Sequence, residues 1–406
     1  MMKRGFRFRP PEVAFGGELR WVLLRGFGPP KEPFLGTVEP EAVRTLAAAL
    51  DLGPRIGSRN GQERLRTELG TDTARKFLIA SAAAEAQGRR IVRLAHRVAG
   101  VAADASVPLV LLKFVALSFS GVVAAGSRSA ADLDVMVAPE HVERLAHALR
   151  SNGFTMLGVP ESDQHVAPFV DGSGAIVEVH RYLQGVRLGR TETFATAGDL
   201  ASLRYLVRVP QFPGDCSIPN REVLAAHVIA HGIAHHGRKP QEYPLFRMVA
   251  DLIDLGFASE GGEAVLEQIT PWLAGEVSSE ENQALRSLCA GLSAGNEELF
   301  TSAAQAKPKV LLLRHLVAGA TDQKYVESLQ VSAFLGRVSH LPRPVAIARA
   351  LWHAVFLNRA QVDKIYGRQS SSVGYLRRRV LRPFDLLVQA THSAMNRLLT
   401  LSRRRT

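Results

Sequence analysis

The chain of 406 residues is 46% hydrophobic and 22% charged, proportions that are ordinary for a globular protein and exclude a disordered or fibrous one. Its two cysteines exclude a disulfide-rich scaffold, so we expect reduced thiols and a cytoplasmic location. The net charge of +12 lies almost entirely at the ends, with +4 over residues 1–33 and +7 over residues 376–406. Both segments lack the interleaved aromatic residues that stack on single-stranded bases, so a nucleic-acid partner is not favoured.

The first 106 residues form two segments that differ in composition and in the spacing of their apolar residues. Residues 1–38 are rich in glycine, proline and arginine without a sustained period, which predicts a basic, loosely ordered arm. Residues 39–106 have apolar side chains at helical spacing, for example Val43, Leu46 and Leu50, and predict an N-terminal helical region.

Strand patterns begin at residue 107 and continue to about residue 190. The stretch 107–126 is long enough to cross a bilayer, but it contains Lys113 and runs into charged sequence. We therefore predict a buried strand followed by a buried helix, and no transmembrane segment. The remaining elements of this small α+β unit are a strand over 127–137, a helix over 140–151, a turn at 171–174 and a strand over 175–180.

Helical patterns return after a connection marked by proline and glycine. Helices are predicted from Asn220 to His236 and from Tyr243 to Phe257, within a helical region over residues 191–375. Residues 376–406 are predicted to form a basic tail.

Carboxylates on two of the predicted strands carry the clearest chemical signal. Asp132 and Asp134 alternate with Leu133 and Val135, so both carboxylates project from one face of the strand. Glu178 occupies the matching face of the later strand. Carboxylate oxygens suit Mg²⁺ or Mn²⁺, and paired metal ions support phosphoryl transfer. The sequence therefore predicts a divalent-metal site on Asp132, Asp134 and Glu178.

Two cations stand near these carboxylates. Lys113 follows the first strand and Arg128 lies four residues before Asp132, where each could neutralise charge on a triphosphate. The alternatives are structural, with Lys113 extending from an apolar helix and Arg128 paired with Asp132.

These residues resemble a known family, the uncharacterised bacterial nucleotidyltransferases of the DNA polymerase β-like superfamily. The family usually reads Leu-Lys-Gly…Arg…Asp-Ile-Asp…Gly-Phe…Glu-x-His. The matching positions here are Leu112-Lys113, Arg128, Asp132-Leu-Asp134, Gly153-Phe154 and Glu178-Val-His180, with further similarity at His227, His231, Asp251 and Arg359–Arg379.

The resemblance implies a polymerase β-like core, a small mixed sheet with helices, surrounded by N- and C-terminal helical regions. It implies Asp132 and Asp134 as metal ligands and Glu178 as the third carboxylate. Candidate substrate or phosphate-binding residues are Lys113, Ser127, Arg128 and His180. Phe114 departs from the family, which has glycine after the lysine, and glycine permits a closer approach of backbone to phosphate.

Histidines recur every four residues on the helix predicted from Asn220. His227, His231 and His235 share one face, and three interpretations remain open: a second metal site, residues lining the active site, or structural histidines. Asp251 and Asp254 on the next helix are candidate hydrogen-bond partners for these imidazoles.

The sequence thus predicts a Mg²⁺-dependent enzyme that moves a nucleotidyl group from an NTP, with ATP the expected donor, to the hydroxyl of an unidentified acceptor. Two alternatives remain. One is a catalytically weak or inactive nucleotide-binding or regulatory protein on the same fold, which Phe114 suggests. The other is an RNA-directed nucleotidyltransferase that uses the basic termini.

Overall fold

The computed structural model describes residues 10–29, 34, 36–158, 165–189, 193–237, 243–273, 275–301, 304 and 307–329. The chain divides into two compact units, residues 1–321 and 322–406, and all that follows concerns the first unit. The predicted basic tail and the similarity over Arg359–Arg379 lie outside the described residues.

Part of the predicted N-terminal arm is a buried helix. Helix α1 (Gly17–Phe27) buries Trp21, Val22, Leu23 and Phe27, so the interpretation of a loosely ordered arm is wrong for this stretch. The spacing of these apolar residues is helical, and the flanking glycines and prolines obscured it. The Nε1–H of Trp21 donates to Glu68 at 2.8 Å, which ties α1 to the helices that follow.

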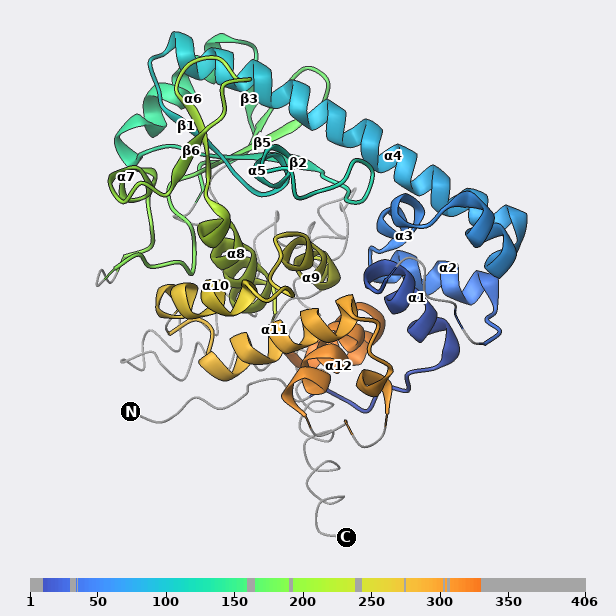
Figure 1. The fold of residues 1–406 in the computed structure, drawn as a ribbon. Helices are drawn as coiled ribbons and strands as arrows, with labels where there is room; N and C mark the ends of the chain where they lie inside the picture. Colours follow the sequence, from blue (N-terminus) through green and yellow to red (C-terminus); the bar gives the residue numbers. More distant parts are fainter. Residues whose placement is uncertain are drawn as a thin grey trace, which may run out of the picture. The chain divides into compact units, whose positions relative to one another are not determined.

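The helices predicted over residues 39–106 are confirmed. They are α2 (Pro40–Ala49), α3 (Gly53–Arg59) and the 43-residue α4 (Gln62–Asp104). Gly70 interrupts α4 with φ +77°, a conformation that side chains other than glycine rarely adopt, and it kinks the helix. Beyond the kink, α4 runs past the sheet and packs against two of its strands (Figure 1).

The unit contains a seven-stranded mixed sheet, which confirms the α+β class. Its strand order is β3-β4-β5-β2-β1-β7-β6. The strands are β1 (Leu109–Leu111), β2 (Asp132–Met136), β3 (Thr155–Met156), β4 (Phe169–Val170), β5 (Ile176–His180), β6 (Leu206–Arg208) and β7 (Cys216–Pro219). Strand β2 pairs antiparallel with β1 and parallel with β5, so the predicted carboxylate strands are direct neighbours.

The sheet extends beyond the α+β segment predicted from the sequence. Strand β7 pairs parallel with β1 and antiparallel with β6, although both β6 and β7 lie in the region predicted to be helical. The short strands are separated and bounded by prolines, and those prolines suggested a connection rather than a sheet. Strand β2 consequently lies inside the sheet, and its residues Leu133 to Met136 are at most 3% exposed.

Some of the remaining helices lie close to this sheet and others lie farther away. Those close to it are α5 (Lys113–Phe119), α6 (Val142–Ser151), α7 (Ala197–Ser202), α8 (Arg221–Ile229) and α9 (Leu245–Asp254). Helices α8 and α9 lie between the sheet and α10 (Gly262–Ile269), α11 (Ser279–Ser293) and α12 (Pro308–Thr321) (Figure 1). Within the described part of the chain, no helix has the length and apolar character needed to cross a membrane.

The predicted turn at residues 171–174 is confirmed and is held by one carboxylate. Asp171 accepts hydrogen bonds from the backbone N–H groups of Ser173 and Ala175 at 2.9 and 3.0 Å, and from Arg97 Nη1 on α4 at 2.6 Å. Gly174 has φ +76° and completes the turn into β5. The turn therefore anchors the strand that carries Glu178 to helix α4.

We expect this turn to make the free energy of unfolding depend on pH in the acidic range. Burial alone would raise the pKa of Asp171, but the hydrogen bonds from Ser173, Ala175 and Arg97 outweigh it and lower the pKa to about 2. Because the folded pKa is below the unfolded value, the stabilisation is present above pH 4 and is lost as pH falls toward 2. Asp171→Asn should cost about 2–3 kcal/mol at neutral pH. Urea unfolding at several pH values checks this, and a variant that matches the wild type at pH 7 would contradict it.

Candidate active site

Asp134 lies at the centre of a cluster of charged and polar side chains. Its Oδ1 is 2.7 Å from Nζ of Lys113 and 2.9 Å from Nε2 of His180, and its side chain is 3% exposed. A carboxylate can only accept hydrogen bonds, so both neighbours donate to it. On β5 the residue paired with Asp134 is Glu178, and the residue paired with Met136 is His180. The parallel register thus brings the two carboxylate strands together, as predicted from the sequence.

Lys113 reaches Asp134 because of a sharp turn between β1 and α5. The N–H of Leu112 donates to the carbonyl of Asp134 at 3.0 Å, which holds the end of β1 against β2. Lys113 then adopts φ +44°, an uncommon conformation for a residue other than glycine, and begins α5. Backbone strain of this kind is often found at functional sites.

Burial and charge act against each other in this cluster. Burial opposes the charge on Lys113, yet Asp134, Glu178 and Asp132 together raise its pKa, so it stays protonated. Burial likewise opposes ionisation of Asp134, but Lys113 and His180 hold its pKa below the usual value. Burial lowers the pKa of His180 despite the adjacent carboxylate, so this imidazole is neutral at pH 7.

Asp132 sits at the start of β2 and is half-buried. Among the residues that the structure describes, none forms an ion pair with it. Burial and the neighbouring Asp134 carboxylate raise its pKa. Two like-charged oxygen donors on alternate residues of one strand, one of them without an ion-pair partner, suit a hard divalent cation such as Mg²⁺. The donor set of Asp132 and Asp134 therefore fits the expected metal.

His165 joins this cluster without having been predicted. It forms an isolated antiparallel bridge with His180, and the two ring centroids are 4.2 Å apart. Its Nδ1 is 3.8 Å from Oε2 of Glu178. Burial lowers the pKa of His165 to about 3, and the nearby ammonium of Lys113 acts in the same direction. The sequence around His165 has no strand period, so no local pattern marks it as part of the site.

Arg128 does not pair with Asp132, as the structural alternative proposed, but with Asp251 on α9. Its Nε is 2.9 and 3.1 Å from the two carboxylate oxygens, and both side chains are buried. The pKa of Asp251 is raised because burial outweighs the attraction of Arg128. Ser127 donates its hydroxyl to the carbonyl of Ala124 at 2.8 Å and so helps to close the loop before β2.

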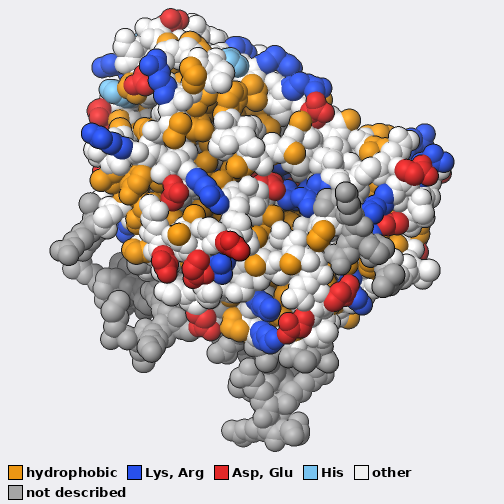
Figure 2. Space-filling model, in the orientation of Figure 1, with side chains coloured by type: hydrophobic (Ala, Val, Ile, Leu, Met, Phe, Trp, Pro, Cys, Tyr) orange, Lys and Arg blue, Asp and Glu red, His pale blue; other side chains and the backbone are white. Residues whose placement is uncertain are grey.

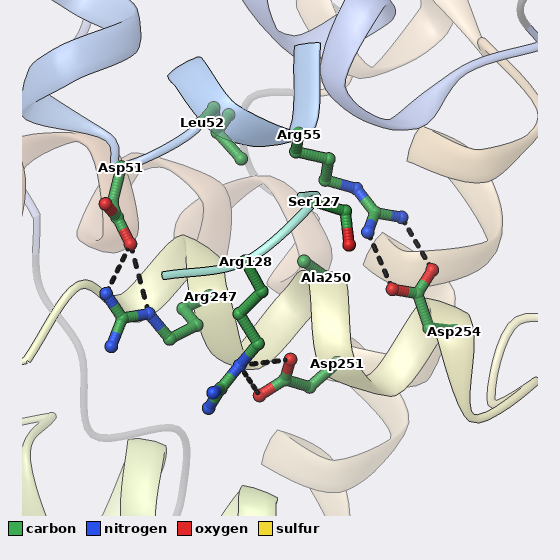
Figure 3. A pocket seen from close by; sticks show the side chains of 9 residues that line it. All are labelled: Asp51, Leu52, Arg55, Ser127, Arg128, Arg247, Ala250, Asp251 and Asp254. Carbon is green, nitrogen blue, oxygen red and sulfur yellow. Dashed lines mark hydrogen bonds and ion pairs between the residues drawn. The ribbon is translucent and has the colours of Figure 1, made fainter. Parts of the chain in front are cut away.

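Three such arginine–aspartate pairs line a small hollow next to Arg128 (Figure 3). Arg55 on α3 binds Asp254 on α9 through two nitrogens at 2.7 and 2.8 Å, and Arg247 on α9 lies 2.6 Å from Asp51. The hollow is lined by Asp51, Leu52, Arg55, Ser127, Arg128, Arg247, Ala250, Asp251 and Asp254. The pairs connect the N-terminal helices to α9 and hold the loop that carries Arg128 between them.

The predicted histidine helix is interrupted by a π-helical segment. Helix α8 ends at Ile229, and Ala230–His235 continues with a π turn, a feature often found at functional sites. The rings of His231, His235, His236 and Tyr243 contact one another, with centroid distances of 4.4 to 5.7 Å.

His227 lies in the last turn of α8 and is buried. Burial lowers its pKa to about 3, and the positive charge of Lys113 acts in the same direction, so this imidazole is neutral at pH 7. Burial and the charge on Lys113 also lower the pKa of His231. The aspartates expected to bind these imidazoles bind arginines instead, Asp251 to Arg128 and Asp254 to Arg55.

Phe114 packs against Gly88 of α4. A Cβ placed on Gly88 of α4 would lie 2.8 Å from Cζ of Phe114, so the ring occupies the notch that this glycine leaves. On another side, the guanidinium carbon of Arg128 lies 5.7 Å from the ring centroid. The phenylalanine that replaces the family glycine therefore has its own packing site between α4 and Arg128.

The chain belongs to a family described as uncharacterised nucleotidyltransferases, whose sequence model matches residues 36–255, more than half of the chain. This confirms the resemblance drawn from the sequence, and every candidate site residue lies within the matched range. A mixed sheet flanked by helices is consistent with a nucleotidyltransferase core. Membership of this family indicates a transferase with nucleotidyltransferase activity in general terms. No match was found among curated proteins or among solved structures.

Proposed function

We propose that this protein is a Mg²⁺-dependent nucleotidyltransferase that moves an NMP group from an NTP, with ATP the expected donor, to an acceptor hydroxyl. The observation that carries the proposal is the placement of Asp132 and Asp134 on an inner strand, with Glu178 paired directly to Asp134 on the parallel neighbour. Three carboxylates and the buried ammonium of Lys113 at one point of a sheet form a set of groups suited to phosphoryl transfer.

Asp132 and Asp134 are the proposed metal ligands. A bound Mg²⁺ would polarise the α-phosphate and stabilise negative charge as pyrophosphate leaves. Lys113 and His180 donate to the same oxygen of Asp134 and fix the orientation of its carboxylate, which leaves the second oxygen to face a cation. A carboxylate that is already oriented in this way does not have to reorient during the reaction.

Glu178 is the proposed proton acceptor for the attacking hydroxyl. Its side chain is 27% exposed, whereas that of Asp134 is 3% exposed, so Glu178 is the carboxylate that an incoming acceptor can reach. A base must lie within hydrogen-bond reach of the proton it removes. In this proposal the buried Asp134 helps to hold the metal ion, and the more exposed Glu178 accepts the proton of the acceptor hydroxyl.

Arg128 is the proposed contact for the triphosphate, held in place by Asp251. The fixed ion pair orients the guanidinium while leaving nitrogens other than Nε for phosphate oxygens. His227 on α8 and His231 on the π-helical segment are proposed to line the active site. Burial keeps both neutral at pH 7, so they can donate or accept hydrogen bonds without adding charge.

Pyrophosphate release tests the proposal directly. The purified chain, incubated with each of the four NTPs, Mg²⁺ and a cell extract as the source of acceptor, should release pyrophosphate, and a chelator should stop the release. Absence of pyrophosphate with every NTP would support the non-catalytic alternative. Pyrophosphate release that continues in the presence of the chelator would contradict a metal site on Asp132 and Asp134.

Replacement of Phe114 separates the catalytic and non-catalytic alternatives. Phe114→Gly restores the family residue, and if the ring impaired catalysis, this change would raise the rate. We expect no increase in rate and a loss of about 2–3 kcal/mol in stability, because the ring fills the notch at Gly88. Steady-state kinetics and thermal unfolding of the variant check both parts, and a clear gain in kcat would show that Phe114 restrains the enzyme.

The face of the molecule in Figure 2 does not favour an RNA-directed transferase. Lys and Arg side chains are interspersed with Asp and Glu side chains on the face in Figure 2, instead of forming a continuous basic track. RNA binding that weakens steeply as salt rises would favour this alternative.

A further inference from the structure

We propose that His165, Glu178 and His180 bind a first-row transition-metal dication such as Zn²⁺, at a site beside the two aspartates. One ligand atom from each residue can be chosen so that all three atoms lie within 4.8 Å of one another. Among the residues that the structure describes, this is the one set of three or more metal-ligating side chains that converges in this way. Two of its three donors are imidazole nitrogens.

The distances are close to those of a metal site. A tetrahedral ion with bonds of about 2.1 Å separates its ligand atoms by about 3.4 Å. Nδ1 of His165 and Oε2 of Glu178 are 3.8 Å apart, too long for a hydrogen bond and close to the separation of two ligands. Both side chains are about a quarter exposed, so small rotations can bring them onto one ion.

An unsatisfied nitrogen supports the same conclusion. Nδ1 of His165 is buried, and it has no hydrogen-bond partner in the described part of the chain. A buried polar atom without a partner costs about 1–3 kcal/mol, which a structural histidine would normally avoid. A metal ion would supply the missing partner.

The backbone fixes two of the ligands. His165 and His180 form a β-bridge, and the N–H of Val166 donates to the carbonyl of Val179 at 3.0 Å. On His180, Asp134 lies 2.9 Å from Nε2, and metal-binding histidines commonly have a carboxylate against the ring in this way. Glu178 and His180 lie on strand β5, and ligands on strands are held more precisely than ligands on loops.

The donor set indicates the class of ion. Imidazole nitrogen suits zinc, cobalt and related ions, whereas Mg²⁺ prefers oxygen and keeps several waters. Three protein ligands leave one position open on a tetrahedral ion, as in catalytic zinc sites. Asp132, Asp134 and Glu178 outnumber the single ammonium of Lys113, so the surroundings favour a cation.

Metal titration of the chelator-treated full chain tests the site. Titration calorimetry should show that one Zn²⁺ ion binds per chain at this site. Co²⁺ bound there should give the visible absorption spectrum of a nitrogen-ligated ion. His165→Ala and Glu178→Gln should each weaken binding at least about tenfold. Two variants of histidines outside the set serve as controls: His147→Ala on the exposed face of α6, and His235→Ala, which removes the exposed histidine of the neighbouring π-helical segment.

The proposal is overturned if Co²⁺ and Zn²⁺ bind no more tightly to the wild type than to His165→Ala, or if His235→Ala removes the binding. Failure of this proposal can be distinguished from failure of the proposed function, because Asp132→Asn should lower transfer by about a thousandfold while leaving the Co²⁺ spectrum in place. Where both proposals hold, Zn²⁺ at this site engages the proposed proton acceptor Glu178, and added Zn²⁺ should inhibit transfer.

Discussion

Asp132→Asn is expected to lower nucleotidyl transfer by about a thousandfold while the protein remains folded. Loss of one carboxylate ligand removes several kcal/mol of stabilisation of charge in the transition state. Asparagine keeps the shape of the side chain but carries no charge. Asp132 makes no ion pair with any residue in the described ranges, so its replacement leaves no partner buried and uncompensated. The replacement should therefore lower kcat/KM and leave the free energy of unfolding nearly unchanged.

The measurement is the initial rate of pyrophosphate release at saturating Mg²⁺, accompanied by thermal unfolding of both proteins. Asp104→Asn is the matched control, because this aspartate is exposed at the end of α4 and lies outside the cluster. A rate within tenfold of the wild type would contradict the role of Asp132. Asp134→Asn should also remove activity, but its loss is harder to interpret because Lys113 and His180 depend on the carboxylate.

Arg128→Met is expected to destabilise the first unit by about 3–5 kcal/mol at pH 7. The side chains of Arg128 and Asp251 are 10% and 2% exposed, and removing one partner of a buried ion pair leaves the other charge without compensation. The loss should also separate α9 from the loop that precedes β2, since this pair is one of the three that link α9 to its neighbours across the hollow (Figure 3).

The effect of Arg128→Met should depend on pH in a defined direction. The pKa of Asp251 is already raised in the folded protein, and loss of Arg128 raises it further. A carboxyl group whose folded pKa is above the unfolded value favours folding when protonated and loses that contribution as pH rises through the folded pKa. The difference between variant and wild type should therefore shrink as pH is lowered from 7 toward 5.

Urea unfolding at each pH provides the measurement, with Arg150→Met on the exposed face of α6 as the matched control. A loss below 1 kcal/mol at pH 7 would show that the pair contributes little. The double replacement Arg128→Met/Asp251→Leu should recover part of the stability, because it removes the uncompensated carboxylate as well.

The carboxylate strands could be predicted because their signals are local. Asp132 and Asp134 alternate with buried Leu133 and Val135 over five residues, and the strand, helix and turn boundaries around them follow from the same short-range patterns. The helices over residues 39–106 were predictable for the same reason. Family resemblance supplied the polymerase β-like class, and the match over residues 36–255 confirms the family.

The parts that the sequence did not predict depend on contacts between distant residues. Arg55 and Asp254 are 199 positions apart, and Arg247 and Asp51 are 196 apart, so no window of sequence shows that they meet. His165 enters the cluster only through its bridge to His180. Strand β7 is short and ends in proline, and its place beside β1 is decided by the sheet rather than by its own pattern.

The most direct test of the central claim follows the fate of the α-phosphate. The purified chain is given Mg²⁺, a cell extract and an NTP labelled on either the α- or the γ-phosphate. A nucleotidyltransferase should transfer the α-label to an acceptor and release the γ-label as pyrophosphate, and both signals should disappear in Asp132→Asn and Asp134→Asn. Transfer of the γ-label to the acceptor, or α-label transfer that persists in both variants, would contradict the site described above.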